Sequence, residues 1–117
     1  EFYSKNFDIN TVILRPFNIY GPGQNKSFLL PHIINQVKYE EKIEVLDLNP
    51  KRDYLFVDDF ANCIINLLNI DIKFDVFNVG SGYSVSVREI IELAQDINNS
   101  NKEVFSKNEI RKKKTFN

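Results

Sequence analysis

Apolar residues follow two different periods along this chain. Continuous or alternating apolar runs, which favour strands, occur at 11–14, 43–46, 53–57, 76–79 and 104–105. Between them, apolar residues recur every three or four positions, which predicts helices over 28–39, from 58 or 59 to about 68, and over 87–97. Residues 1–6 match the end of another helix. Strands and helices that alternate at this interval indicate an α/β fold.

Local signals refine two of these elements. The run from Thr11 to Leu14 is apolar and rich in β-branched residues, which is typical of a strand buried on both faces of a parallel sheet. Ser86 and Glu89 have the spacing of a capping box, and Val85 and Ile90 are placed for a hydrophobic staple. A helix is therefore expected to begin directly after Ser86.

Two other segments are predicted from residue type. Asp58 or Asp59 is expected to cap the helix that follows residue 57, since a carboxylate accepts hydrogen bonds from the first helical amides. The residues expected to face inward on that helix are Ala61, Ile64, Ile65 and Leu68. Residues 16–23 contain two Pro and two Gly and are expected to form a loop.

Composition and charge narrow the class of protein. The chain has 117 residues, enough for one domain or part of one, and its formal net charge is −1. This net charge gives no overall electrostatic attraction to nucleic acid or to an anionic membrane. Five basic residues fall in the last eleven positions, where a solvated tail is expected. With no apolar run of about twenty residues, no signal peptide and a single cysteine, a cytoplasmic protein is expected. The start without Met suggests a fragment.

Three segments carry candidate chemistry. The Arg15–Gly23 segment follows a buried strand, where ligands of α/β proteins bind, but a purely structural loop is the alternative. Arg52 offers a planar fork of donors suited to phosphate; taken alone, a surface ion pair with Asp53 is the favoured interpretation. The Gly80–Gly82 segment precedes a helix but lacks a complete dinucleotide-binding fingerprint, so a turn is favoured over a phosphate site. One His and one Cys do not build a metal site.

Taken in order, these segments resemble a known family. The matching segments are Arg15–Gln24, Phe28–Ile34, Arg52–Asp59, Phe77–Gly82 and Ser86–Ile90. They are similar to the extended short-chain dehydrogenases/reductases, the NAD-dependent epimerase/dehydratase family that includes the isomerase UDP-glucose 4-epimerase. The resemblance implies the C-terminal fragment of a Rossmann-type enzyme, with one or two sheet strands and a small mixed α/β subdomain. Residues 1–25 would end the Rossmann portion and form the substrate loop, and 26–117 would form the nucleotide-sugar-binding subdomain.

The resemblance also implies roles for individual residues. Pro16 and Phe17 would lie beside the nicotinamide of NAD. Asn18 would bind the sugar or its diphosphate, and Arg52 would bind the diphosphate. The remaining implied substrate contacts are Leu29 at the nucleotide, Glu44 and Leu46 at the base, and Arg111 at a second phosphate. The segment between Leu46 and Arg52 is one residue shorter than is usual in the family.

Two family motifs have no counterpart in the 117 residues. These are the Gly-x-x-Gly-x-x-Gly dinucleotide loop and the Tyr-x-x-x-Lys catalytic pair. The chain by itself is therefore expected to be inactive and to bind NAD only weakly, although the full-length parent would use NAD. Its expected partners are a nucleoside-diphosphate sugar, the missing N-terminal Rossmann portion and, through an open edge at residues 11–14, a homodimer or strand-swapped oligomer. Neither nucleic acid nor a membrane is expected as a partner.

The alternative function belongs to another class. A stand-alone binding module would use the basic tail to bind nucleic acid or an acidic partner, and salt would weaken that binding. Binding of a nucleoside diphosphate that is lost in Arg52→Ala would favour the enzyme-related function instead.

Overall fold

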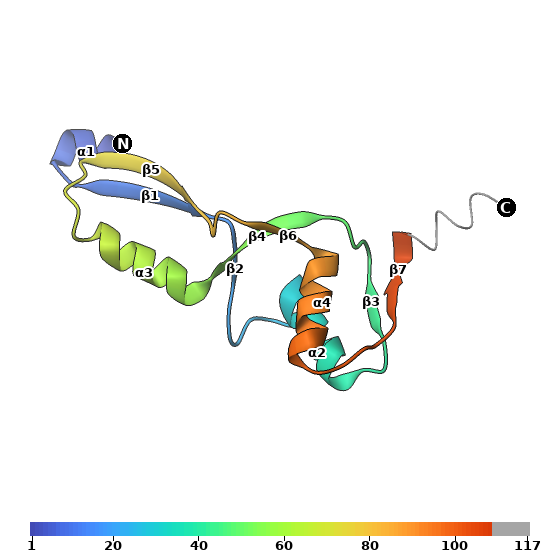
Figure 1. Ribbon diagram of the computed structural model, residues 1–117. Coiled ribbons are helices and arrows are strands. Elements are labelled where there is room, and N and C mark those ends of the chain that lie inside the picture. The colour runs from blue at the N-terminus through green and yellow to red at the C-terminus, as the bar shows by residue number, and fades with distance from the viewer. Residues whose placement is uncertain (109–117) are drawn as a thin grey trace. The chain divides into compact units, whose positions relative to one another are not determined.

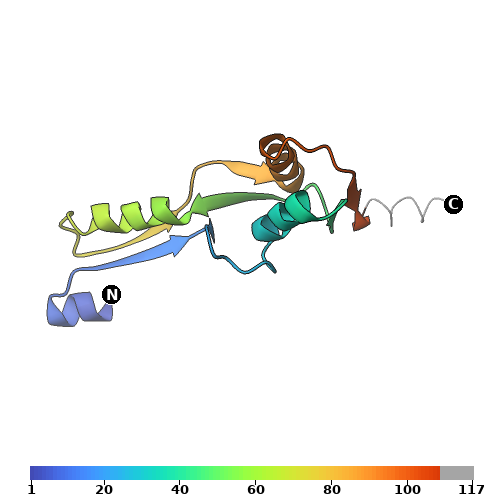
Figure 2. The ribbon, with the colours of Figure 1, turned by 90° about the horizontal axis from the view of Figure 1, so that it is seen from below.

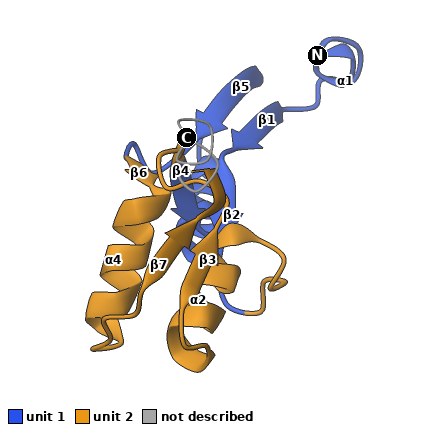
Figure 3. Ribbon diagram, turned by 90° about the vertical axis from the view of Figure 1, so that its right-hand side faces the viewer, with its two compact units in different colours: residues 1–22, 53–83 blue, residues 23–52, 84–117 orange. Residues whose placement is uncertain are grey.

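The computed structural model describes residues 1–108 and shows alternating helices and strands (Figure 1). The helices are α1 (Phe2–Phe7), α2 (Leu29–Tyr39), α3 (Val57–Leu67) and α4 (Val87–Ile97). The strands are β1 (Thr11–Pro16), β2 (Asn18–Tyr20), β3 (Ile43–Val45), β4 (Lys51–Phe56), β5 (Phe74–Val79), β6 (Ser84–Ser86) and β7 (Val104–Ser106). Figure 3 colours two compact units, each made of two separate stretches of chain. Unit 1 comprises 1–22 and 53–83, and unit 2 comprises 23–52 and the chain from 84 onward.

Unit 1 contains two pairs of parallel strands. β1 pairs with β5 from Thr11 opposite Phe74 to Pro16 opposite Val79, and the two strands run side by side in Figures 1 and 2. β2 pairs with β4, with Asn18 opposite Tyr54. Parallel strands start and end together, so the segments that follow β1 and β5 emerge at the same end of this pair.

Unit 2 holds most of the buried apolar side chains. β3 and β7 pair in parallel, helices α2 and α4 pack against each other, and β6 pairs with β4, whose first two residues belong to this unit. The buried hydrophobic residues of unit 2 are Ile33, Val37, Ile43, Val45, Leu48, Val87, Ile90 and Ile91. In unit 1, Leu55 is the one buried hydrophobic residue among those described.

Two buried glutamines complete the unit 2 core. Gln36 of α2 donates to the Glu44 carbonyl and accepts from the Glu44 amide. Gln95 of α4 makes the same pair of bonds with the backbone of Lys102. A buried polar group is costly unless it is hydrogen-bonded. These bonds therefore hold β3 against α2 and the segment before β7 against α4.

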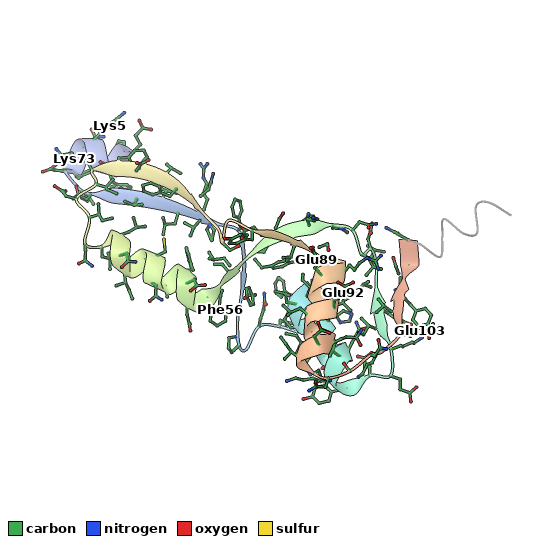
Figure 4. All side chains as sticks on the ribbon, in the orientation of Figure 1. Lys5, Phe56, Lys73, Glu89, Glu92 and Glu103 are labelled. Carbon is green, nitrogen blue, oxygen red and sulfur yellow. The ribbon has the colours of Figure 1, made fainter. Side chains whose placement is uncertain are left out.

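Most elements predicted from the sequence are present. The structure confirms the helix at the start of the chain, the strands near residues 11, 43, 53, 76 and 104, and the helices α2 and α4. The capping box of α4 is also confirmed, at the helix start that carries Glu89 in Figure 4. The Ser86 hydroxyl accepts from the Glu89 amide at 3.2 Å, and the Ser86 amide donates to the Glu89 carboxylate at 2.7 Å.

Three expectations were wrong. β1 is not buried on both faces, since Ile13 is 41% exposed and β5 is the one described strand that pairs with β1. Neither Asp58 nor Asp59 caps α3: both lie inside its first turn, and Phe56 occupies the N-cap without a side-chain bond. Within the expected loop at 16–23, three residues form β2. The local sequence did not predict this strand, because its partner strand β4 lies far along the chain.

The inward faces of two helices also differ from the prediction. On α3, the residues expected to face inward are all exposed: Ala61, Ile64, Ile65 and Leu68. Phe60, Cys63 and Leu67 are half-buried instead, at helical spacing on another face. On α4, helical spacing predicts an inward stripe of Val87, Ile90, Ile91, Ala94 and Ile97, but Ile97 is exposed.

Candidate functional site

The carboxyl ends of β1 and β5 bring two segments together in unit 1. The Phe17 amide donates to the Val79 carbonyl at 2.9 Å, which continues the strand pairing by one residue beyond Pro16. Phe17 and Asn18 then leave this end from β1, and the Gly80–Gly82 turn leaves it from β5. This is the kind of position where α/β proteins bind ligands.

Asp53 of β4 binds the turn that follows β5. Its carboxylate accepts from the Ser81 amide at 2.8 Å, the Ser81 hydroxyl at 2.8 Å and the Gly82 amide at 3.0 Å. Hydrogen bonds to the charged form, first that from the Ser81 amide, hold the pKa of Asp53 below its ordinary value. The Gly80–Gly82 segment is thus confirmed as a turn, and the amides that would hold a phosphate already donate to a carboxylate.

Asn18 and Phe17 are held from two sides. The Asn18 side-chain amide donates to the Asp53 carbonyl at 2.9 Å. Because that carbonyl only accepts, the atom facing it is the Asn18 nitrogen Nδ2. The Phe17 ring packs on Gly80 so closely that a Cβ at residue 80 would lie 2.3 Å from its Cδ2 atom. Phe17 is nevertheless 51% exposed, so part of its ring is available to a ligand.

Arg52 precedes Asp53 on β4 but does not form the expected surface pair with it. Its Nη1 atom donates to the Lys51 carbonyl at 2.8 Å, and the side chain is exposed. Within residues 1–108, the ion pairs are Lys5–Glu1, Lys42–Glu44 and Lys73–Asp8. The alternative of an Arg52–Asp53 ion pair is therefore wrong, and the guanidinium remains accessible from solvent.

The other predicted substrate residues belong to unit 2. Leu29 is the first residue of α2 and is half-buried. Glu44 of β3 is ion-paired with Lys42 at 2.5 Å, and this partner lowers the pKa of the Glu44 carboxyl. Leu46 is exposed, and its carbonyl accepts from the Asn108 amide at 3.0 Å. Arg111 lies outside the described residues.

The structure thus brings together one part of the predicted site. Pro16, Phe17 and Asn18 lie in unit 1, and Arg52 lies in unit 2, so a common site for Asn18 and Arg52 stays a prediction. Sequence reasoning missed the role of Asp53. A carboxylate on one strand and a Gly-Ser-Gly turn after another were visible as separate signals, but the strand topology that joins them was not.

The described residues contain neither a metal-binding cluster nor a membrane-spanning helix. Among residues 1–108, no group of three or more His, Cys, Asp or Glu side chains is placed to hold a metal ion. No helix in that range combines the length and the apolar character that crossing a bilayer requires.

The strand order, the loop after β1 and the Arg52–Asp53 strand define a class of protein. Residues 1–80 match the family model described as the NAD dependent epimerase/dehydratase family, and the chain belongs to that family. The chain is 36% identical over 92 residues to GDP-6-deoxy-D-mannose reductase of Pseudomonas aeruginosa, an alignment covering 74% of this chain and 30% of that protein. It is 30% identical over 96 residues to dTDP-4-dehydro-6-deoxyglucose reductase of Escherichia coli, covering 79% of this chain and 30% of that protein.

A solved structure agrees with these relatives. The structure of RMD from Pseudomonas aeruginosa complexed with NADPH superposes with a TM-score of 0.79 at 31% identity, covering 89% of this chain and 38% of that one. The fold is therefore that of part of a Rossmann-type short-chain dehydrogenase/reductase, as expected. The chain spans about 30% of the length of the curated relatives described above.

Proposed function

We propose that this chain is the substrate-binding portion of an NAD(P)-dependent enzyme that acts on a nucleotide sugar. The observation that carries the proposal is the presentation of Phe17 and Asn18 at the carboxyl ends of β1 and β5, held by Asp53 and Gly80. Family membership supplies the class of chemistry, and the two relatives are named for GDP- and dTDP-linked deoxy sugars.

The residues at the β1 end fit a place beside a nicotinamide ring. Pro16 and Phe17 are apolar, are exposed and lie on a backbone fixed by the pairing with β5. When bound, the cofactor supplies hydride transfer to or from a sugar carbon. The contribution of Pro16 and Phe17 is to exclude water from one side of the ring and to fix its orientation.

The polar residues suit the sugar diphosphate. Asn18 has a second amide hydrogen and a carbonyl oxygen beyond the bond to Asp53, so it has both a donor and an acceptor for a ligand. The exposed Arg52 guanidinium would meet the two negative charges of the diphosphate, with Arg111 at a second phosphate. Leu29, Glu44 and Leu46 would line the nucleotide; the backbone amide and carbonyl of Glu44 already bond to Gln36, so Glu44 would contact it with its side chain.

Among the reactions of the family, we favour reduction of a keto sugar over epimerisation and dehydration. The two relatives reported above are both reductases of 6-deoxy sugar nucleotides. Proton transfer in that reaction requires an acid such as the Tyr of the Tyr-x-x-x-Lys pair, which these 117 residues lack. The 117-residue chain would therefore bind its ligand without turning it over.

Binding of nucleoside-diphosphate sugars to the purified chain tests this function. We expect GDP-, dTDP- and UDP-sugars, titrated calorimetrically, to bind weakly, with the favoured base binding most tightly. Arg52→Ala should weaken binding about 10- to 100-fold, because charge-assisted hydrogen bonds to phosphate contribute roughly 1.5–3 kcal/mol. Addition of NAD or NADPH should give no change in absorbance at the nicotinamide band.

Arg88→Ala is the matched control. It removes the same charge from an exposed position on α4, so it should leave the affinity unchanged. Equal affinity of Arg52→Ala and the unmodified chain would refute the proposed role of Arg52. Turnover by the chain alone would contradict the proposed inactivity, and salt-sensitive binding of nucleic acid would favour the alternative of a basic binding module.

A further inference from the structure

One residue of unit 1 contacts two segments that are distant from it in sequence. Asp53 lies on β4, 35 residues from Asn18 and 28 and 29 residues from Ser81 and Gly82. Its main-chain carbonyl binds the Asn18 side chain, and its carboxylate binds the turn after β5. The two functional groups of Asp53 therefore serve different segments.

The Gly80–Gly82 turn also supports the Phe17 ring. An added Cβ at Gly80 would lie 2.3 Å from Phe17 Cδ2, 2.7 Å from Phe17 Cε2 and 2.7 Å from the Asp53 Oδ2 atom. The ring and the carboxylate thus both border the position that a side chain at residue 80 would occupy, and they leave no room for one. A shift of the turn would move the surface on which the ring packs.

We propose that Asp53 is a positioning residue, whose carboxylate holds the Gly80–Gly82 turn against the Phe17 ring while its carbonyl orients the Asn18 amide. The functional consequence rests on the proposed function, with Phe17 beside the nicotinamide and, of the two contacts proposed for Asn18, the contact with the sugar rather than with its diphosphate. Asp53 itself touches neither ligand. It sets the distance and angle between the two residues that do, which is the requirement for orienting reacting groups.

The contacts between residue 53 and the Gly80–Gly82 turn require a carboxylate. Three donors converge on its two oxygens, namely two backbone amides and the Ser81 hydroxyl. An asparagine at residue 53 would turn an NH₂ group toward at least one of these donors, and the displaced backbone amide would lose its acceptor. Loss of the Ser81 hydroxyl alone would leave both amide bonds in place, so Ser81→Ala should have a small effect.

The ligand-free chain provides the first test, by nuclear magnetic resonance. Asp53→Ala should shift the Ser81 and Gly82 amide resonances and the Phe17 ring resonances, whereas the Asn18 side-chain amide should move less because the carbonyl at residue 53 is retained. Sodium formate, which supplies a free carboxylate, should return the turn and ring resonances toward their original positions. Sodium chloride at equal ionic strength should not.

Asp75→Ala is the matched control for this test. Asp75 lies on β5 of the same unit, and its carboxylate accepts from the amide of the adjacent Val76 at 2.7 Å. This substitution should leave the Phe17 and Gly82 resonances unchanged. If Asp53→Ala also leaves the Phe17 ring unchanged, or if formate restores the turn amides without restoring the ring, the positioning role is overturned.

A second test uses ligand affinity and separates the two proposals. Asp53→Asn should weaken binding of the nucleotide sugar about three- to tenfold, the effect of one or two net hydrogen bonds, and leave the affinity for the nucleoside diphosphate alone unchanged. A merely structural role would weaken both. If the unmodified chain binds neither ligand, the proposed function fails, and the formate experiment still decides whether Asp53 positions Phe17.

Discussion

At the scale of single residues, Gly80 has the least room for a side chain among the glycines of the chain. Its missing side chain leaves room for both the Phe17 ring and the Asp53 carboxylate. Gly82, two residues on, is required for a different reason, since its φ of 85° lies in the left-handed region and nothing within 4 Å would meet a Cβ there. One glycine therefore provides space, and the other provides a backbone conformation.

Gly80→Ala should destabilise unit 1 by about 1–3 kcal/mol, the usual cost of forcing an extra carbon into a packed site. A double-substitution cycle measured by urea unfolding identifies the cause. With Phe17→Ala, the cost of Gly80→Ala should fall by about 1 kcal/mol or more, because the clashing ring is gone. The cost of Gly82→Ala should be the same with Phe17 or Ala at residue 17. If the cost of Gly80→Ala is also the same in both backgrounds, the Phe17 ring is excluded as the source of the strain.

The sequence predicted residue roles where the partner is near in the chain. Ser86 and Glu89 are three positions apart, so their capping box was predictable from spacing. The bonds of Asp53 to Ser81 and Gly82 depend on where β4 and β5 place them, which no local pattern encodes. Because these contacts are tertiary, the sequence did not predict them, although it shows Asp53, Ser81 and Gly82 as separate signals.

At the scale of elements, the helices with strong local signals were predicted better than the strands β2 and β6. α4 begins at its capping box, and α2 begins one residue after the predicted start. β2 and β6 have three residues each and pair with β4, so their strand character comes from a distant neighbour and not from their own composition. α3 begins at Val57 without a side-chain cap, which explains the misplaced boundary.

The capping box of α4 should make its stability depend on pH. The bond from the Ser86 amide is the main cause of the lowered pKa of Glu89. Because the pKa of Glu89 is lowered in the folded state, its carboxylate stabilises the folded chain at pH values above the ordinary glutamate pKa of about 4.3. This stabilisation is lost as the pH falls through the folded-state pKa. Glu89→Gln should therefore be less stable than the unmodified chain at neutral pH, and the two should converge in acid.

Thermal unfolding followed by circular dichroism between pH 2 and 7 measures this convergence. Glu92→Gln is the control, because Glu92 lies on the same helix outside the capping box (Figure 4). A stability difference for Glu89→Gln that stays constant across this range would show that the carboxylate charge does not contribute to the cap.

At the scale of the whole molecule, the two units differ in how much apolar surface they bury. Of the buried hydrophobic residues in the described part of the chain, eight lie in unit 2 and Leu55 alone lies in unit 1. α3 presents Ile64 and Ile65 to solvent, and Leu68, the residue that follows the helix, is 79% exposed. Extended apolar patches of this kind favour association.

The isolated chain should therefore self-associate as its concentration rises, through the apolar face of α3, the open edge of β1, or both. Ile65→Lys should shift the equilibrium toward monomer, since it places a charge in the exposed stripe of α3. Leu93→Lys, at a comparably exposed site on α4 in unit 2, is the control. Sedimentation velocity measures the distribution, and a monomer at every concentration would contradict this expectation.

The chain passes from one unit to the other three times, near residues 22, 52 and 83, and this order constrains its folding during synthesis. Thr11 emerges from the ribosome 63 residues before Phe74, its partner across the parallel pair. At about 5–20 residues per second, the first strand waits roughly 3–13 s for its neighbour. During that interval β1 is without β5, its partner in the parallel pair, and we expect chaperones that bind extended hydrophobic chain to recognise this nascent segment.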